Sequence, residues 1–252
     1  MSRFAIILPA AGQSSRFGGM EKKPFVSLEG RPVWQRAAEP FWSRQDVVKV
    51  YVVISPDDRD DFRRRFHPLL AFVENVEIVD GGAERFESVA NALARVPAEV
   101  DFVAVHDAVR PLISTPLLES VFRAAEQHGA AMPAVPVADT LKQVDPATNR
   151  IVGTVPRAGL WQAQTPQVFR RDWLAEAYAK RASLAAPITD DAQLIEAVGH
   201  SVVVVPGSPT NFKITTKEDL ELAEAILKAR AARMRPAADE PRWGAFDDEA
   251  KW

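Results

Sequence analysis

Apolar residues are arranged in two different patterns along this 252-residue chain. Short continuous apolar runs recur, and each ends at proline, glycine, serine, aspartate or a similar turn residue, which is typical of buried strands. We expect strands at residues 4–8, 47–54, 76–79, 101–106, 130–137, 162–169 and 202–205.

Between these runs, apolar residues return every three or four positions, as they do on the buried face of a helix. Arg63, Arg64 and Arg65 fall on the polar side of one such pattern, and we interpret them as a solvent-exposed face. We expect helices at residues 31–42, 57–72, 84–94, 115–127 and 171–181, one that begins near 189–191, and a last one after 216–219.

Strands that alternate with helices predict an α/β fold, here a Rossmann-like, mostly parallel open sheet flanked by helices. Ligands of such sheets bind outside the carboxyl ends of the strands. No repeat or internal linker divides the chain, so we expect a single domain over residues 1–232. Residues 233–252 are rich in proline, alanine and acidic residues without a helical period, and we expect a flexible tail.

The alternation of strands and helices is interrupted at residues 139–156. Two alternating runs, 140–144 and 150–155, flank the turn-forming segment 145–149, which predicts a protruding β-hairpin arm. An isolated hairpin is only marginally stable in water, so this arm is expected to pack on another surface. That surface can belong to the same domain or to a partner subunit.

Composition limits what the chain can bind. It carries 31 Lys and Arg against 34 Asp and Glu, a formal net charge of −3, so bulk attraction to nucleic acid is not expected. Any anion site must be local, which favours a small ligand. The absence of cysteine excludes disulfides, cysteine-ligated zinc and a thiol nucleophile. With no secretion signal and no apolar run near the ~18 residues of a membrane span, we expect a cytoplasmic protein without membrane contact.

The loop after the first predicted strand carries the strongest chemical signal. Residues 9–19 combine two alanines, three glycines, two serines and Arg16, and Lys22 and Lys23 follow them. Small side chains leave backbone N–H groups accessible, and neighbouring cations favour an anionic ligand. We therefore interpret this segment as a phosphate-binding loop.

Two further loops are expected to border the same cleft. Gly81–Gly82 lies between a predicted strand and a helix N-terminus, and Asp107–Arg110 follows strand 101–106. Because the carboxyl ends of parallel strands lie along one edge of a sheet, both loops should meet the loop at 9–19 there. We interpret His106, at the end of its strand, as a structural residue.

Six motifs that occur in order along the chain are Pro9–Gly12 with Arg16 and Lys23, Gly81–Val89, Val105–Pro111, Trp161–Gln167, Thr189–Ala192 and Asn211–Thr215. The first resembles the nucleotidyltransferase superfamily of enzymes that activate sugar phosphates. Together the motifs resemble one family, the 2-C-methyl-D-erythritol 4-phosphate cytidylyltransferases of the non-mevalonate isoprenoid pathway. The resemblance covers about residues 4–228, and six motifs in the right order are specific where any single motif would be weak.

The reaction that the resemblance implies is attack by the phosphate of methylerythritol phosphate on the α-phosphorus of CTP, with release of pyrophosphate. Because the second pKa of such a phosphate is about 6, the nucleophile is largely deprotonated at neutral pH and needs no general base. Catalysis then depends on positioning and on charge stabilisation by Arg, Lys and a divalent metal. The implied cofactor is Mg²⁺ or another divalent cation, held mainly by the CTP phosphates, with Asp107 as a candidate ligand of its water shell.

The resemblance also implies roles for individual residues. Arg16 and Lys23 match the cationic pair that stabilises the pentacoordinate phosphorus. The positions that match the nucleotide site are Pro9, Ala10, Ala11, Gly12, Gly82, Ala83 and Ser88. The positions that match the acceptor site are Thr140, Arg157, Thr165, Lys213, Asp107 and Arg110.

Thr140 and Arg157 flank the predicted arm, which in the family crosses into the neighbouring subunit. The resemblance therefore implies a homodimer, joined through the arm, in which each active site is completed by its partner. A monomer of this kind would bind CTP yet transfer poorly.

Three positions depart from the family pattern. Ser14 occupies a position where the family has glycine, and Ala83 replaces a common aspartate. Lys22 precedes Lys23 and is a rival for the same role. The departures leave the pattern of charges intact, but they leave the fine specificity open.

Two alternatives stay open at this stage. A related polyol-phosphate cytidylyltransferase, for example one acting on ribitol 5-phosphate, would meet its acceptor with similar Arg, Lys and Asp groups. A non-catalytic nucleotide-binding module on the same fold is the other alternative. The retained Arg16, Lys23, Arg157 and Lys213 weigh against it.

Overall fold

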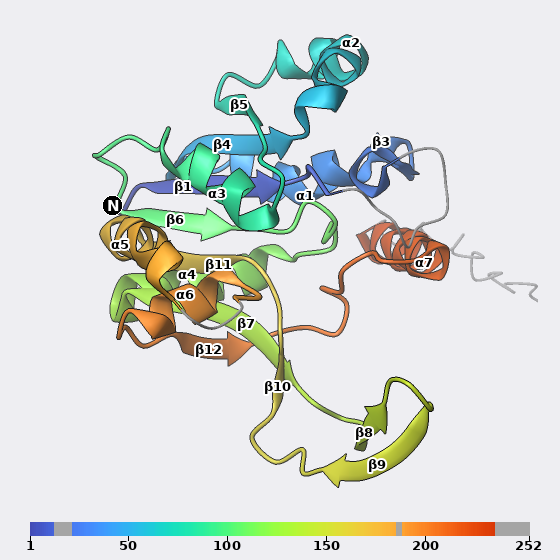
Figure 1. The fold of residues 1–252 in the computed structure, drawn as a ribbon. Helices are drawn as coiled ribbons and strands as arrows, with labels where there is room; N and C mark the ends of the chain where they lie inside the picture. Colours follow the sequence, from blue (N-terminus) through green and yellow to red (C-terminus); the bar gives the residue numbers. More distant parts are fainter. Residues whose placement is uncertain (13–21, 185–187, 235–252) are drawn as a thin grey trace, which may run out of the picture.

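A computed structural model of the chain describes residues 1–12, 22–184 and 188–234 (Figure 1). Within these residues an eight-stranded sheet has the order β10-β7-β11-β6-β1-β4-β5, and β12 pairs with β7. Its strands are β1 (Phe4–Pro9), β4 (Val47–Ile54), β5 (Val76–Asp80), β6 (Phe102–Val105), β7 (Ala130–Pro136), β10 (Trp161–Ala163), β11 (Gln167–Arg170) and β12 (Val203–Pro206). Pairing is parallel except that β11 runs antiparallel to β6 and β7, and β10 antiparallel to β7. The predicted mostly parallel open sheet is thus confirmed.

The helices lie between the strands in sequence, as their apolar periods predict. They are α1 (Val33–Trp42), α2 (Arg59–Leu70), α3 (Arg85–Leu93), α4 (Thr115–His128), α5 (Arg171–Lys180), α6 (Asp191–Ala197) and α7 (Lys217–Met234). Short 3₁₀ turns cover Lys23–Phe25, Pro56–Asp58 and Arg181–Ser183. No helix of the described ranges is long and apolar enough to cross a membrane.

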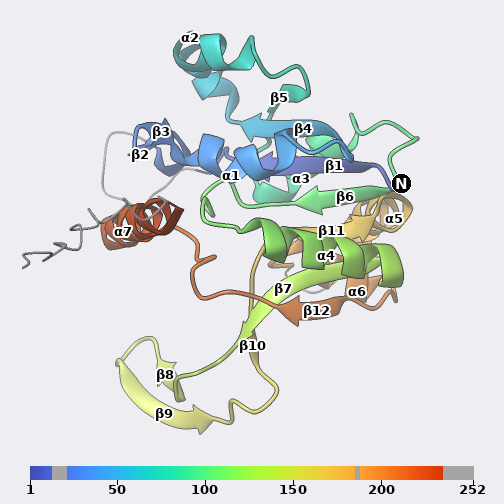
Figure 2. The same cartoon turned by 180° about the vertical axis from the view of Figure 1, so that it is seen from behind.

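Side-chain alternation along the strands builds two apolar layers. Phe4, Ile6 and Leu8 of β1 pack toward α1, α2 and α4, and Figure 2 shows α1 and α4 in front of that face. Ala5 and Ile7 pack toward α3, α5 and α6, which cover the opposite face in Figure 1. Because both faces are covered, the central strands read as continuous apolar runs.

A third apolar cluster lies beside the carboxyl end of the sheet. Helix α7 packs there, through Ala223, against Val109, Leu112 and Leu28, and Leu28 belongs to a small hairpin, β2 (Ser27–Leu28) with β3 (Arg31–Pro32). The backbone N–H of Ile214 donates to the carbonyl of Val109 at 2.9 Å. This bond ties the segment before α7 to the loop that follows β6.

Two predicted elements differ from those observed. The run 162–169 forms two strands, β10 and β11, because Pro166 between them has no N–H to donate; both strands pair with β7, and β11 also pairs with β6. The helix expected from residue 31 begins at Val33, because Arg31 and Pro32 pair with β2. The prediction that Arg63, Arg64 and Arg65 are solvent-exposed is confirmed.

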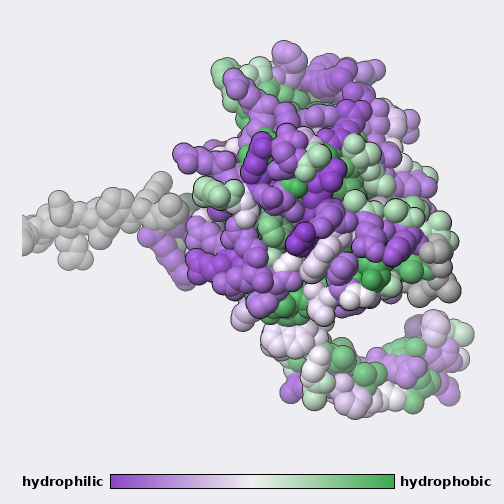
Figure 3. Space-filling model, turned by 90° about the vertical axis from the view of Figure 1, so that its left-hand side faces the viewer, coloured by the Kyte–Doolittle hydropathy of each residue, from purple (hydrophilic) through white to green (hydrophobic). Residues whose placement is uncertain are grey.

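The predicted arm is present as β8 (Leu141–Asp145) paired with β9 (Arg150–Val155) in a separate two-stranded sheet. Figures 1 and 2 show it projecting from the body beyond β10 and β7. Apolar side chains lie exposed on it, among them Val144 at 44%, Ile151 at 63% and Val152 at 61%. Figure 3 shows such apolar surface on the arm, separated from the body by a gap.

Candidate active site

A cavity of about 240 Å³ opens at the carboxyl ends of the central strands. It brings together three segments that are far apart in sequence, as the sheet topology predicts. Its lining includes most of the described residues predicted for the nucleotide and acceptor: Pro9, Ala10, Ala11, Gly12, Lys23, Gly82, Ala83, Ser88, Asp107 and Lys213. Arg16 and Ser14 lie outside the described residues.

The first loop leaves β1 with its backbone held against the sheet. The N–H of Ala10 donates to the carbonyl of Val53 at 2.7 Å, which keeps the small residues that follow at the cavity wall. The side chains of the neighbouring residues Lys22 and Lys23 have different surroundings. Nζ of Lys22 lies 2.6 Å from Oδ2 of Asp58, whereas Lys23 lines the cavity.

The second loop depends on a glycine pair. A Cβ on Gly81 would lie 2.7 Å from Cβ of Ala11, and one on Gly82 would lie 2.3 Å from Cβ of Glu87, so neither position has room for a side chain. The buried hydroxyl of Ser88 accepts from the N–H of Gly82 at 3.1 Å and donates to the carbonyl of Glu84 at 3.2 Å. The loop is therefore bonded to the first turn of α3.

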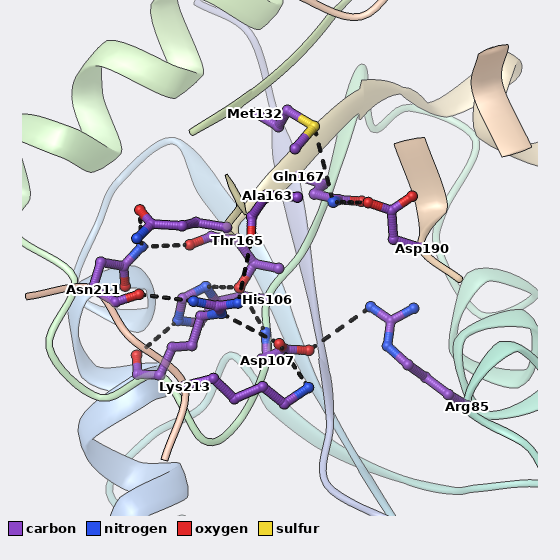
Figure 4. A network of polar contacts seen from close by, with 12 residues as sticks. Arg85, His106, Asp107, Met132, Ala163, Thr165, Gln167, Asp190, Asn211 and Lys213 are labelled. Carbon is purple, nitrogen blue, oxygen red and sulfur yellow. Dashed lines mark hydrogen bonds and ion pairs between the residues drawn. The ribbon is translucent and has the colours of Figure 1, made fainter. Parts of the chain in front are cut away.

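Asp107 lies at the centre of a group of cations, shown in Figure 4. Its carboxylate is 3.1 Å from Nζ of Lys213, 3.3 Å from Nε of Arg110 and 3.9 Å from Nη2 of Arg85. Burial by itself would raise the pKa of Asp107, but these three cations lower it far below the usual range. Asp107 is therefore an ionised anchor for the cations and not a general base.

Hydrogen bonds that run from Asp107 through Thr165 to His106 fix the backbone of Asp107. Nε2 of His106 lies 3.1 Å from the carbonyl of Arg110, which can only accept, so Nε2 carries the proton. Burial lowers the pKa of His106 to about 4, so Nδ1 is an acceptor and receives the Thr165 hydroxyl at 3.0 Å. Thr165 Oγ1 in turn accepts the N–H of Asp107 at 3.0 Å. The interpretation of His106 as structural agrees with this chain of bonds.

Two predicted acceptor residues lie outside the described lining of the cavity. Thr165 is 5% exposed, and its hydroxyl donates to Nδ1 of His106. The Arg110 side chain is 12% exposed, and Nη1 donates to the carbonyl of Asn211 at 2.8 Å. Both residues support the loop that carries Asp107, and neither lines the cavity as described.

The two predicted acceptor residues of the arm also lie outside the described lining of the cavity. Thr140 and Arg157 are exposed and flank the hairpin, and neither contributes to the described lining of the cavity. The chain by itself brings together the nucleotide half of the predicted site and part of the acceptor half.

Arg85 is a cavity residue that the sequence reasoning missed. It belongs to the motif Gly81–Val89 and to the predicted helix 84–94, neither of which gives it a role of its own. Asp191, which lies 2.8 Å from Arg85, belongs to the motif Thr189–Ala192 at the start of another predicted helix. The signal was an arginine directly after a glycine-rich loop at a helix N-terminus.

The described residues do not offer a protein cage for a metal ion. No group of three or more His, Cys, Asp or Glu side chains is arranged around a common point in that part of the chain. Asp107, the candidate ligand, is already surrounded by cations.

Comparison with known proteins identifies close relatives. The family model of 2-C-methyl-D-erythritol 4-phosphate cytidylyltransferase matches residues 4–229. The protein of that name from Dechloromonas aromatica is 44% identical over 235 residues, which cover 91% of this chain and 100% of that protein. A "Bifunctional enzyme IspD/IspF" from Rhodospirillum rubrum is 40% identical over 98% of this chain, and the match spans 63% of that longer protein.

Solved structures agree with the sequence matches. The 2-C-methyl-D-erythritol 4-phosphate cytidylyltransferase of Thermus thermophilus superposes with a TM-score of 0.73 at 32% identity, covering 90% of this chain and 100% of that one. The 4-diphosphocytidyl-2C-methyl-D-erythritol synthase of Anaerococcus prevotii superposes with a TM-score of 0.75 at 28% identity, covering 90% and 99%.

Proposed function

The chain belongs to the 2-C-methyl-D-erythritol 4-phosphate cytidylyltransferase family, and we propose that it transfers CMP from CTP to 2-C-methyl-D-erythritol 4-phosphate. The products are 4-diphosphocytidyl-2-C-methyl-D-erythritol and pyrophosphate. The observation that carries the proposal is the cavity in which the loops after β1, β5 and β6 meet Lys23 and Lys213.

The cavity suits a reaction between two anions. An oxygen of the acceptor phosphate forms a bond to the α-phosphorus of CTP, and the bond to the β-phosphate oxygen breaks as pyrophosphate leaves. The small residues from Pro9 to Gly12 and the Gly82 loop bind the nucleotide, and Lys213 meets the acceptor. Lys23, with Arg16, stabilises the charge that grows on the phosphoryl oxygens.

A divalent cation, Mg²⁺ or another, stays part of the proposal as a cofactor carried in with the nucleotide. When bound to the triphosphate it would neutralise charge there. Because the described residues offer no cage for it and Asp107 is ion-paired with Lys213 and Arg110, its ligands would be mainly the CTP phosphates.

A homodimer joined through the arm completes the site. Thr140 and Arg157 are exposed at the arm, and exposed apolar residues such as Ile151 and Val152 supply a surface that a partner subunit would cover. With the arm of one protomer placed at the cavity of the other, Arg157 would reach the acceptor phosphate. A cytoplasmic location is also part of this proposal.

The first test is pyrophosphate release by the purified chain with CTP and a panel of polyol phosphates. We expect turnover with 2-C-methyl-D-erythritol 4-phosphate. A preference for ribitol 5-phosphate would identify a different acceptor, and the absence of turnover with every acceptor would show that the enzyme assignment is wrong.

The second test uses the neighbouring lysines as a matched pair. Lys23→Ala should lower kcat about 10²- to 10³-fold, the usual cost of removing one charge-stabilising group, while CTP binding changes far less. Arg16→Ala should behave in the same way. Lys22→Ala should stay near wild type because Lys22 pairs with Asp58. Equal losses for Lys22→Ala and Lys23→Ala would show that the wrong lysine was chosen.

A further inference from the structure

Arg85 lies at the boundary between the two proposed halves of the cavity. It is the first residue of α3 and follows the loop with Gly82 and Ala83, on the nucleotide side. Its Nη2 lies 3.9 Å from Oδ1 of Asp107, on the acceptor side. In Figure 4 the Arg85 guanidinium and the Lys213 amine approach the Asp107 carboxylate from different directions.

A buried carboxylate holds the other edge of this guanidinium. Nη1 of Arg85 lies 2.8 Å from Oδ2 of Asp191, whose side chain is 1% exposed against 35% for Arg85. The Tyr178 hydroxyl donates to Oδ1 of Asp191 at 2.6 Å. Burial and the charge of Asp191 both raise the pKa of Tyr178, so its hydroxyl stays a donor. Oδ1 of Asp191 thus accepts a hydrogen bond from Tyr178, and Oδ2 forms the ion pair with Arg85.

The segment that carries Asp191 is bonded to the sheet. Gln167 of β11 donates to Oδ2 of Asp190 at 2.8 Å and accepts from the N–H of Ala192 at 3.0 Å. Asp190 also caps α6 by accepting from the N–H of Gln193 at 3.0 Å. Asp191, between Asp190 and Ala192, therefore has a fixed place from which to hold Arg85.

The charges of this cluster favour an anionic ligand. Three cations, Arg85, Arg110 and Lys213, face two carboxylates, Asp107 and Asp191, which leaves one positive charge in excess. Asp107 has closer partners in Lys213 and Arg110 than in Arg85. The guanidinium edge of Arg85 that faces the cavity is therefore available to phosphate oxygens.

We propose that Arg85 is a further catalytic residue that contacts the phosphate oxygens where nucleotide and acceptor meet. Asp191 and Tyr178 are the positioning residues that hold its guanidinium there. This inference rests on the cytidylyl transfer proposed above. A cation fixed before the reaction stabilises the charge that grows on the oxygens during transfer, without reorganisation at that moment.

The experiment measures steady-state kinetics with CTP and 2-C-methyl-D-erythritol 4-phosphate. Arg85→Lys keeps the charge but loses the planar fork, so kcat should fall about 30- to 100-fold while KM for CTP changes less than about threefold. Asp191→Asn should lower kcat about 10- to 100-fold, and the milder Tyr178→Phe about 3- to 10-fold, since both act through Arg85.

A double-mutant cycle separates positioning from mere support of the fold. If Asp191 and Tyr178 act through Arg85, adding either substitution to Arg85→Lys should lower kcat by less than about twofold more. Losses that multiply in the double variants would overturn the positioning roles. Wild-type kcat in Arg85→Lys would overturn the catalytic role.

Glu176→Gln is the matched control, because it also removes the charge of a carboxylate, here one on α5 that pairs with Lys180 and His200 away from Arg85. It should keep wild-type kinetics. If Asp191→Asn folds poorly, Tyr178→Phe, which leaves both charges in place, carries the positioning test. Failure of the proposed function would instead appear as no turnover by the wild-type chain.

Discussion

At the scale of single residues, the site is a set of charges whose positions are fixed by buried polar bonds. Asp107 is ionised because Lys213, Arg85 and Arg110 outweigh the effect of burial on its pKa. Its backbone is held in turn by Thr165 and His106. A change at Thr165 or His106 can therefore move the Asp107 carboxylate with which Lys213 pairs.

The role of Thr165 can be tested with two substitutions. Thr165→Val keeps the shape but leaves the N–H of Asp107 and Nδ1 of His106 without partners, so the free energy of unfolding should fall by about 1–3 kcal/mol. Thr165→Ser keeps the hydroxyl and should stay within about 1 kcal/mol of wild type. Urea unfolding measures both.

A direct contact of Thr165 with the acceptor would give a different result. If Thr165 contacts the acceptor phosphate, Thr165→Val should raise KM for the polyol phosphate and leave the free energy of unfolding unchanged. That result would support a place for Thr165 in the acceptor site, as the family resemblance implies.

At the scale of elements, β7 and β10 determine where the arm begins. Strand β10 pairs with β7 through residues 161–163 and 134–136, so the chain leaves the body on two adjacent strands. Beyond them β8 and β9 form a separate two-stranded sheet, with a register shift between Gln143 and Val144. This geometry carries Thr140 and Arg157 away from the body of their own chain.

The trans arrangement predicts recovery of activity when two inactive variants are mixed. Arg157→Ala damages the arm and Lys23→Ala damages the cavity, so a heterodimer of the two contains one intact site. After co-refolding of equal amounts, half of the dimers are mixed, and about one quarter of wild-type kcat should return. The measurement is pyrophosphate release before and after mixing.

Lys23→Ala mixed with Lys213→Ala is the control, because both changes lie in the same cavity and no intact site can form. Activity equal to the sum of the separate variants in the Arg157→Ala mixture would contradict an arm that acts in trans.

At the scale of the whole molecule, buried His106 links stability to pH. Its pKa is lowered from 6.5 to about 4, so the unfolded chain binds this proton at a pH where the folded chain does not. Stability is therefore lost as pH falls below about 6.5. Between about pH 7.5 and about pH 5 the free energy of unfolding should fall by about 2 kcal/mol from this residue alone.

Urea titrations of wild type and His106→Gln at several pH values test this prediction. The variant is expected to be less stable at about pH 7.5 but to lose about 2 kcal/mol less over the same interval. Parallel pH dependence in the two proteins would show that His106 titrates normally. Asp107 does not interfere, since its lowered pKa affects stability only below the usual aspartate range.

Much of this protein could be predicted from local sequence. Apolar runs such as 47–54 identify strands, because a strand covered on both faces buries side chains on both sides and so is apolar at nearly every position. The order of strands and loops then places Gly12, Gly82 and Asp107 at one edge of a parallel sheet. The family motifs supplied the substrates, since motif residues record chemistry that periodicity does not.

What only the tertiary structure decided is which way each side chain faces and with which distant partner it pairs. Lys22 and Lys23 are neighbours in sequence, yet one meets Asp58 and the other lines the cavity. Arg85 on α3 meets Asp191 on α6, a separation in sequence at which no local pattern can indicate an ion pair. Sequence determined the sheet and the order of the loops because those follow from local burial, whereas the charge network depends on packing between segments that only folding brings together.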